Sequence, residues 1–167
     1  NISNVGYGAF WGVCGTLESI RVDSPNALGS ANSYSREYID GESRRVYQGL
    51  QFRDRGCTKL HTVILGDNVE TVGSYVLSAL SSLTTLTIGS SVTSIGSSAF
   101  SGASSLTSLT IPDSVTSIGN GAFNGAASLT SVTIPNSVTS IGANAFNGAA
   151  SLTSVTIPNS VTSIGAN

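Results

Sequence analysis

The sequence predicts a repeat solenoid, in which coils of 23 residues stack through short parallel β-strands. The first observation is a leucine that recurs every 23 residues, at Leu60, Leu83, Leu106, Leu129 and Leu152. The second is that the stretch 125–144 recurs without change as 148–167. The third is that other apolar residues keep fixed offsets from this leucine in successive coils. Together they predict one elongated core that neighbouring coils share.

Each coil is expected to contain two short extended segments. In the coil that starts at Leu129, residues 131–134 alternate polar and apolar, which is the period of a half-buried strand. Pro135 ends this segment because proline has no N–H to donate to a sheet, and Asn136 is a turn former. Residues 138–141 form the second segment. From Ala145 the chain is expected to return in a short helical or irregular stretch.

One apolar offset is aromatic and predicts the centre of the core. Phe100, Phe123 and Phe146 occupy the same position in three successive coils, and Leu77 occupies it in an earlier one. Because neighbouring coils stack, these phenylalanines are expected to form a column inside the solenoid, with Leu77 as its non-aromatic member.

The chain divides into three parts. Residues 1–23 contain partial repeats, since Leu17 begins a coil; residues 57–167 contain the regular repeats. Between them, residues 24–56 depart from the pattern. The step from Leu17 to Leu60 is 43 residues, which is one period with 20 residues inserted. We therefore predict one non-repeat insertion within an otherwise continuous stack.

The pattern L-x-x-V-x-I-P-x-x-V-x-x-I-G-x-x-A-F-x-x-A/C of these coils closely resembles the BspA-like, or Treponema-type, leucine-rich repeat. Cys14 and Cys57, each three residues before the leucine, are similar to that family's cysteine-bearing turn. The resemblance covers residues 57–167 tightly and 1–22 more loosely. It implies a leucine-rich-repeat superhelix in a surface or secreted protein that serves in adhesion or protein contact.

The charge pattern excludes several classes of partner. The net charge is −2, all seven basic residues lie between Arg21 and Lys59, and from residue 71 onward Asp113 is the only charged side chain. Electrostatic binding of nucleic acid or of an anionic membrane is therefore not expected. No apolar run reaches the roughly 20 residues of a membrane-spanning helix. The neutral repeats offer little like-charge repulsion against association.

The insertion has the composition of a recognition element. Tyrosine and arginine are the residues most enriched at interface hot spots, and the candidates here are Tyr34, Arg36, Tyr38, Arg44, Arg45, Tyr47, Arg53 and Arg55. Asp40-Gly41 lies between two segments that suit a β-hairpin, although the spacing of Tyr34 and Tyr38 also suits a helix. A solvated loop outside the solenoid remains an equal alternative to an interface.

Outward hydroxyl residues form ladders along the predicted first strands. The candidate ladder consists of Thr85, Thr87, Ser108, Thr110, Ser131, Thr133, Ser154 and Thr156. A further threonine column, Thr93, Thr116, Thr139 and Thr162, follows the second segment. Such ladders resemble the faces of ice-binding proteins, but threonine also simply suits exposed strand positions. The hydroxyls are also candidate O-glycan sites, and Asn1 begins the one N-glycosylation sequon.

Residues capable of chemistry are few. His61 is the single histidine and follows Leu60 at an offset that threonine occupies in later coils, so we expect it on the surface and not in a catalytic site. Asp67 occupies a turn position, where capping explains it better than calcium binding. Cys14 and Cys57 share an offset in successive coils; we favour two buried free thiols, with a disulfide as the alternative. We expect no cofactor and no metal.

These observations predict a non-enzymatic extracellular or cell-surface scaffold for contact with copies of itself, with another surface or matrix protein, or with glycans. One alternative is an adhesin that binds a host or matrix protein, and another is an ice-binding surface. The sequence opens and closes within coils, without polar capping repeats. We therefore expect end-to-end filaments or a longer array within a larger assembly.

Overall fold

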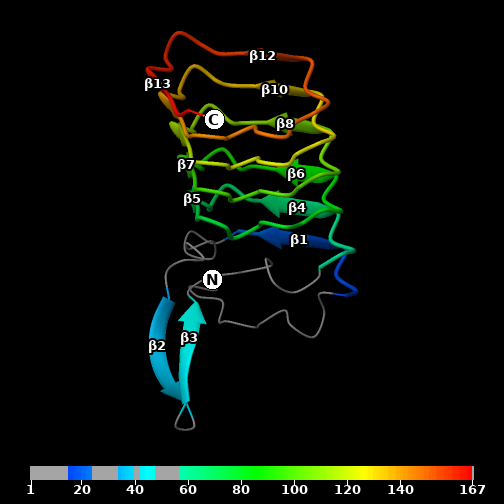
Figure 1. Ribbon diagram of the computed structural model, residues 1–167, viewed down its shortest axis with the longest axis vertical. Helices are drawn as coiled ribbons and strands as arrows, with labels where there is room; N and C mark the ends of the chain where they lie inside the picture. Colours follow the sequence, from blue (N-terminus) through cyan, green and yellow to red (C-terminus); the bar gives the residue numbers. More distant parts are fainter. Residues whose placement is uncertain (1–14, 24–33, 40–41, 48–56, 167) are drawn as a thin grey trace.

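The protein is described from a computed structural model, in which residues 15–23, 34–39, 42–47 and 57–166 are placed well enough to describe. For residues 34–39 and 42–47 this holds for the backbone alone. The coils stack along the long axis of the molecule, as the period predicts (Figure 1). The predicted solenoid with short parallel β-strands is therefore confirmed.

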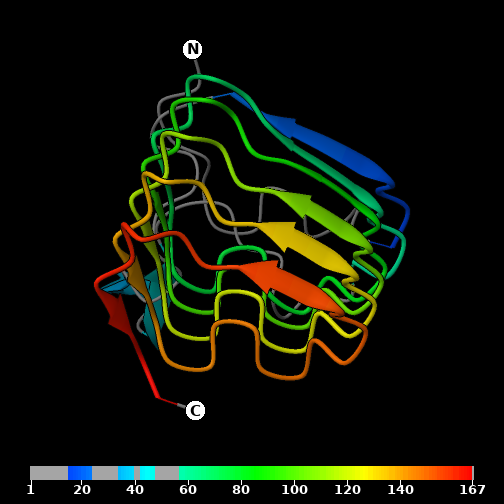
Figure 2. The same cartoon turned by 90° about the horizontal axis from the view of Figure 1, so that it is seen from above.

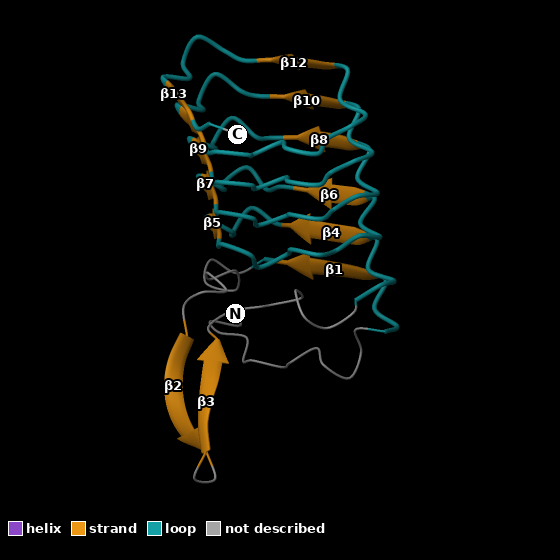
Figure 3. Cartoon of the chain, in the orientation of Figure 1, coloured by secondary structure: helices purple, strands orange, loops and turns teal. Residues whose placement is uncertain are grey.

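Two sets of strands run along two sides of the stack (Figures 2 and 3). The first strands of the coils are β1 Ser19–Val22, β4 Thr62–Leu65, β6 Thr85–Thr87, β8 Ser108–Thr110, β10 Ser131–Thr133 and β12 Ser154–Thr156. The second strands are β5 Thr71–Val72, β7 Ser94–Ile95, β9 Ser117–Ile118, β11 Ser140–Ile141 and β13 Ser163–Ile164. The second strands make one five-stranded parallel sheet, whereas the first strands make two sheets, β1-β4-β6 and β8-β10-β12.

The strand register places side by side two coils whose leucines are 43 residues apart in the sequence. β1 pairs in parallel with β4, and Ser19 lies opposite Thr62. The coil that starts at Leu17 therefore lies directly against the coil that starts at Leu60.

The aromatic column lies inside the stack as predicted. The ring of Phe123 stacks on those of Phe100 and Phe146, with centroids 5.4 and 5.5 Å apart and interplanar angles of 8°. Phe100, Phe123 and Leu77 are fully buried. Each ring thus covers the face of the next, and the core is continuous between coils.

The return segment consists of turns that need two left-handed residues in each coil. One left-handed column is Tyr75, Ser98, Gly121 and Asn144, and the other is Ala79, Gly102, Gly125 and Gly148, with φ between 53° and 80°. Glycine and asparagine adopt this conformation readily, whereas other residues are strained in it. The earliest of these coils, with Tyr75 and Ala79, therefore forms the same turn from less suitable residues.

The insertion contains a β-hairpin. β2 Tyr34–Ile39 pairs antiparallel with β3 Glu42–Tyr47, and Ile39 lies opposite Glu42. The predicted turn Asp40-Gly41 connects them and lies outside the described residues. Within the described residues the two strands pair only with each other. The hairpin is confirmed and the helical alternative for residues 34–39 is wrong.

Candidate contact surfaces

The candidate hydroxyl ladder lies on the outer face of the first strands. All eight of its residues are exposed, while the residues between them in β8 and β10, Leu109 and Val132, are each 5% exposed and belong to the core. The register places Ser131 between Ser108 and Ser154. We call these eight residues the strand-face ladder: Thr85, Thr87, Ser108, Thr110, Ser131, Thr133, Ser154 and Thr156.

The hydroxyls of the strand-face ladder have no hydrogen-bond partner among the described residues. Each hydroxyl carries one donor and can accept as well. The ladder therefore presents a regular, uncharged set of hydrogen-bonding groups to whatever lies against it.

The hydroxyls of the threonine column along the second segment form hydrogen bonds within the protein. Thr116 Oγ1 donates to the carbonyl of Thr93 over 3.1 Å, and Thr139 Oγ1 donates to the carbonyl of Thr116 over 3.2 Å. The same bond joins Thr93 to Glu70 and Thr162 to Thr139. Because each hydroxyl bonds the coil before it, this column stabilises the stack and is less available to a ligand.

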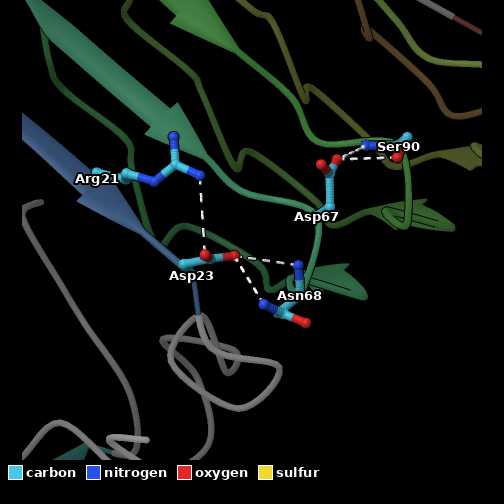
Figure 4. Close-up of polar contacts among 5 residues, drawn as sticks. All are labelled: Arg21, Asp23, Asp67, Asn68 and Ser90. Atoms are coloured by element: carbon cyan, nitrogen blue, oxygen red, sulfur yellow. Dashed lines mark hydrogen bonds and ion pairs between the residues drawn. The ribbon is translucent and has the colours of Figure 1, made fainter.

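Asp67 caps the next coil. Its Oδ1 accepts hydrogen bonds from the backbone N and the Oγ of Ser90, both 2.8 Å away (Figure 4). The hydrogen bond from the Ser90 backbone is the largest cause that lowers the pKa of Asp67, and the hydrogen bond from the Ser90 hydroxyl lowers this pKa further. The expected capping role is confirmed, although the partner lies in the following coil and not in the turn of Asp67 itself.

A similar carboxylate cap occurs one coil earlier. Asp23 Oδ1 accepts from both the backbone N and the side-chain Nδ2 of Asn68, each at 3.2 Å, and its Oδ2 lies 3.7 Å from the Arg21 guanidinium (Figure 4). Within the described residues, no group of three or more His, Cys, Asp or Glu side chains is placed to hold a metal ion. The acidic residues at this end thus link the coils to one another.

His61 lies on the surface, as expected. Its Nδ1 lies 3.1 Å from the hydroxyl of Thr62, and its Nε2 lies 3.9 Å from a carboxylate oxygen of Glu18 in the adjacent coil. Its side chain is 50% exposed. These contacts place His61 in a surface pair between coils.

The preference for free thiols was wrong. Cys57 is 5% exposed and disulfide-bonded. Cys14 is the only other cysteine in the sequence and lies outside the described residues. The shared offset predicted that the two positions are neighbours, and coil spacing of about 4.8 Å falls in the Cα range that a disulfide allows. The sequence alone does not determine whether such a pair forms two free thiols or a disulfide.

The hairpin register sorts the predicted interface residues into two faces. Tyr34 lies opposite Tyr47, and Arg36 lies opposite Arg45. Since strand positions alternate between faces, Tyr34, Arg36, Tyr38, Arg45 and Tyr47 share one face. Arg44 is on the other, opposite Glu37. Arg53 and Arg55 lie outside the described residues, as does Asn1.

Sequence reasoning missed a groove on the other side of the stack. It has a volume of about 520 Å³ and crosses successive coils along the second strands. Its lining includes a serine column, Ser94, Ser117, Ser140 and Ser163, and a glycine column, Gly96, Gly119, Gly142 and Gly165. The strict recurrence of Ser-Ile-Gly in four coils is the signal, but by itself this pattern indicates only a strand followed by a bend.

The glycine column permits the coils to approach closely at this groove. A Cβ on Gly119 would lie 2.6 Å from both the carbonyl carbon of Gly96 and the nitrogen of Ser97. Atoms that are not bonded do not approach so closely, and these neighbours are backbone that cannot rotate away. Glycine at this offset is therefore a packing requirement and not only a means of bending the chain.

The sequence matches the family model described as BspA type Leucine rich repeat region, in six copies over residues 52–167. This range is more than half of the chain. The chain belongs to this family. The resemblance predicted from the spacing of leucine, proline and phenylalanine is thereby confirmed. The family is in general a non-enzymatic scaffold fold whose domains mediate protein–protein interaction. Among curated proteins, none matches the chain.

The solved structure of one bacterial leucine-rich-repeat protein shares the fold. A leucine-rich-repeat protein of Treponema pallidum is 23% identical with a TM-score of 0.65, over 89% of this chain and 69% of that one. A leucine rich cell surface protein of Faecalibacterium prausnitzii is 28% identical with a TM-score of 0.49, over 89% and 43%. A leucine-rich-repeat protein of Bacteroides ovatus is 19% identical with a TM-score of 0.38, over 88% and 47%.

Proposed function

We propose that this protein is a non-enzymatic extracellular or cell-surface scaffold that associates with copies of itself and contacts other proteins or glycans. The observation that carries the proposal is the strand-face ladder. It is exposed and in register within β8, β10 and β12, and its hydroxyls are unpaired within the described residues. Family membership supports a contact role, since domains of this type in general mediate protein interaction.

An extracellular or surface location is supported by the disulfide of Cys57 and by family membership. Cys57 is disulfide-bonded, and disulfides persist mainly in oxidising compartments such as the cell exterior. Proteins with this repeat are typically on the cell surface. No helix in the described part of the chain is long and apolar enough to cross a membrane.

Self-association is supported by the low charge of the coils. From residue 71 onward Asp113 is the only charged side chain, so little electrostatic repulsion opposes contact between copies.

Sedimentation velocity over a range of protein concentrations tests self-association and locates it. Thr110→Lys with Thr133→Lys places two charges on the strand-face ladder. Ser105→Lys with Ser128→Lys is the matched control, since it adds the same charge at half-buried positions elsewhere on the coils. We expect the wild type and the control to associate and the ladder variant to remain monomeric. A wild-type chain that stays monomeric at tens of micromolar would contradict self-assembly.

An adhesin is a second candidate, favoured by the hairpin. The Tyr34 face of β2–β3 combines tyrosine and arginine, the residues enriched at hot spots. Deleting residues 32–48 should leave the coils folded, since shortening a long loop changes its closure entropy little. Thermal unfolding monitored by circular dichroism tests whether the coils remain folded. Binding to a panel of purified matrix proteins tests whether the hairpin is needed for adhesion. Unfolding of the coils on deletion would show that the insertion belongs to the core.

Ice binding is a third candidate, favoured by the unpaired hydroxyls of the strand-face ladder. An ice surface is uncharged and ordered, and a regular hydroxyl array can bond to it without desolvating charges. The Thr93 column does not support this role, because its hydroxyls bond the preceding coil. Thermal hysteresis of the isolated protein decides the matter, and its absence would remove this candidate.

A further inference from the structure

The sheet of first strands is interrupted between β6 and β8. β6 pairs with β4, and β8 pairs with β10, but β6 and β8 do not pair with each other, although they belong to neighbouring coils (Figure 1). The second strands of the same two coils, β7 and β9, do pair. We call this interruption, between the coils that start at Leu83 and Leu106, the seam.

The hydrogen bonds that are missing at the seam are present at the boundaries on either side of it. The Thr84 N–H donates to the carbonyl of His61 over 3.0 Å, and the Thr130 N–H donates to that of Thr107 over 3.1 Å. The hydroxyls of Thr84 and Thr130 donate to the same two carbonyls. At the seam, neither the N–H nor the hydroxyl of Thr107 donates to any group among the described residues.

The same two coils are joined firmly on their other sides. The Gly119 N–H donates to the carbonyl of Ile95 along the second strands, and the Phe100 N–H donates to that of Ala122 in the return segment, both over 2.8 Å. The rings of Phe100 and Phe123 stack across this boundary with centroids 5.4 Å apart. The coils are therefore held along two sides and not along the first strands, which is the arrangement of a one-sided hinge.

The residue that follows the first strand changes at the seam. It is glycine in the two coils before the seam, Gly66 and Gly89, and proline in the coils after it, beginning with Pro112. A Cβ on Gly89 would lie 2.6 Å from the carbonyl carbon of Gly66, so this approach requires glycine. Proline carries a Cβ and a ring, and Pro112 cannot approach Gly89 as closely as Gly89 approaches Gly66. The seam thus coincides with the place where this close approach ends.

We propose that the seam opens and closes in the folded protein, with the stack bending about the side of β7 and β9. Opening one boundary on one side breaks few contacts, so it requires much less free energy than unfolding the whole stack. Leu86, in β6, is already only partly buried, whereas its equivalent in β8, Leu109, is 5% exposed. Opening would admit water between these two leucines.

Opening would also divide the strand-face ladder. Thr85 and Thr87 lie on one side of the seam, and the other six hydroxyl residues, beginning with Ser108, lie on the other. A partner that contacts both parts binds one state of the seam better than the other and shifts the balance between them. The inference goes beyond the proposed contact function and does not depend on it, because the opening belongs to the chain alone.

The test is thiol labelling of the full chain under native conditions, with a matched pair of variants. Leu109→Cys and Val132→Cys each place a thiol at a core position that is 5% exposed, in the middle of a first strand. Leu109 is in β8, at the seam, whereas Val132 is in β10, which pairs with strands on both sides. The wild type, in which Cys57 is disulfide-bonded, gives the background. Thermal unfolding verifies that both variants are folded.

We expect the Leu109→Cys variant to be labelled about tenfold faster than the Val132→Cys variant, or more, because local opening exposes only the first of these positions. Its labelling rate should hardly change in low denaturant, since local opening exposes little surface, whereas labelling of the Val132→Cys variant should accelerate as global unfolding does. This denaturant dependence separates opening of the seam from any general loss of stability caused by the substitution. Equal rates, or the same denaturant dependence in both variants, would overturn the proposal.

Amide hydrogen exchange of the wild type, resolved by residue with NMR, provides a second measurement that needs no substitution. The Thr107 amide should exchange much faster than those of Thr84 and Thr130, while the Phe100 amide, on the joined side of the same boundary, should be protected. A Thr107 amide as protected as that of Thr130 would contradict the seam. Fast exchange at Phe100 would show that the two coils separate completely and do not bend about one side.

Discussion

Threonine occupies two kinds of position on these coils that look alike in the sequence and differ in the structure. Thr116 and Thr110 are both exposed, and both recur in the four coils that start at Leu83, Leu106, Leu129 and Leu152. The Thr116 hydroxyl donates to the carbonyl of Thr93, whereas the Thr110 hydroxyl has no partner within the described residues. One column therefore stabilises the stack and the other is available to a partner. Exposure alone does not separate a structural side chain from a functional one; the hydrogen bonds do.

The largest expected effect concerns the core that both columns surround. Phe123→Ala removes a fully buried ring between two stacked neighbours and should lower the free energy of unfolding by about 3–5 kcal/mol, because a cavity opens between coils. Chemical denaturation measures the loss. Phe146→Ala should cost less, since Phe146 is only partly buried. A loss below about 1 kcal/mol for Phe123→Ala would contradict the register of the coils.

The second effect tests how closely the coils approach under the groove. Gly119→Ala places a Cβ 2.6 Å from backbone atoms of the preceding coil, so the coils must separate locally at a cost of about 1–3 kcal/mol or more. Gly125→Ala is the control, since its Cβ would have 3.7 Å of space but a φ of 74°, and that strain costs about 1–2 kcal/mol. Thermal melts of both variants compare crowding with backbone strain. An unchanged melt for Gly119→Ala would show that the stack is looser than described.

Much of this fold could be predicted because each buried position is filled by apolar residues at a fixed offset in successive coils. Phe123 and Leu129 recur at the same offsets in successive coils, so the period identifies the core directly. Other features depend on what a neighbouring coil presents. The hydroxyl of Thr116 bonds a carbonyl 23 residues away, and the disulfide of Cys57 requires a second cysteine. Tyr75 and Ala79 adopt positive φ while their N–H groups bond the carbonyls of Ser97 and Ser101 in the next coil, and their residue types do not predict this conformation.

The third effect tests the threonine comparison directly. Thr116→Val keeps the shape of the side chain but removes the donor to the Thr93 carbonyl, and should lower the free energy of unfolding by about 0.5–1.5 kcal/mol. Thr110→Val removes a hydroxyl without a protein partner and should leave stability within about 0.5 kcal/mol of wild type. Denaturant titration of the two variants gives the difference. Equal losses of unfolding free energy in the two variants would show that both threonine columns contribute equally to stability.

The smallest effect is the pH dependence of the cap between coils. Hydrogen bonds from the backbone and hydroxyl of Ser90 lower the pKa of Asp67 in the folded protein. A carboxyl whose folded pKa is depressed stabilises the fold above its unfolded pKa of about 3.9, and this contribution is lost as the pH falls through the folded pKa.

Asp67→Asn removes the titrating group, so its unfolding should respond less than that of the wild type to acidification from about pH 5 to about pH 3. Asp113→Asn is the matched control, since Asp113 is the exposed aspartate at the equivalent turn position two coils later. Because Asp67 is exposed to solvent, which screens such interactions, the difference should be a small shift in the melting temperature. Parallel acid titrations of wild type and both variants measure it. A larger pH response in Asp67→Asn than in wild type would reverse the sign and contradict the cap.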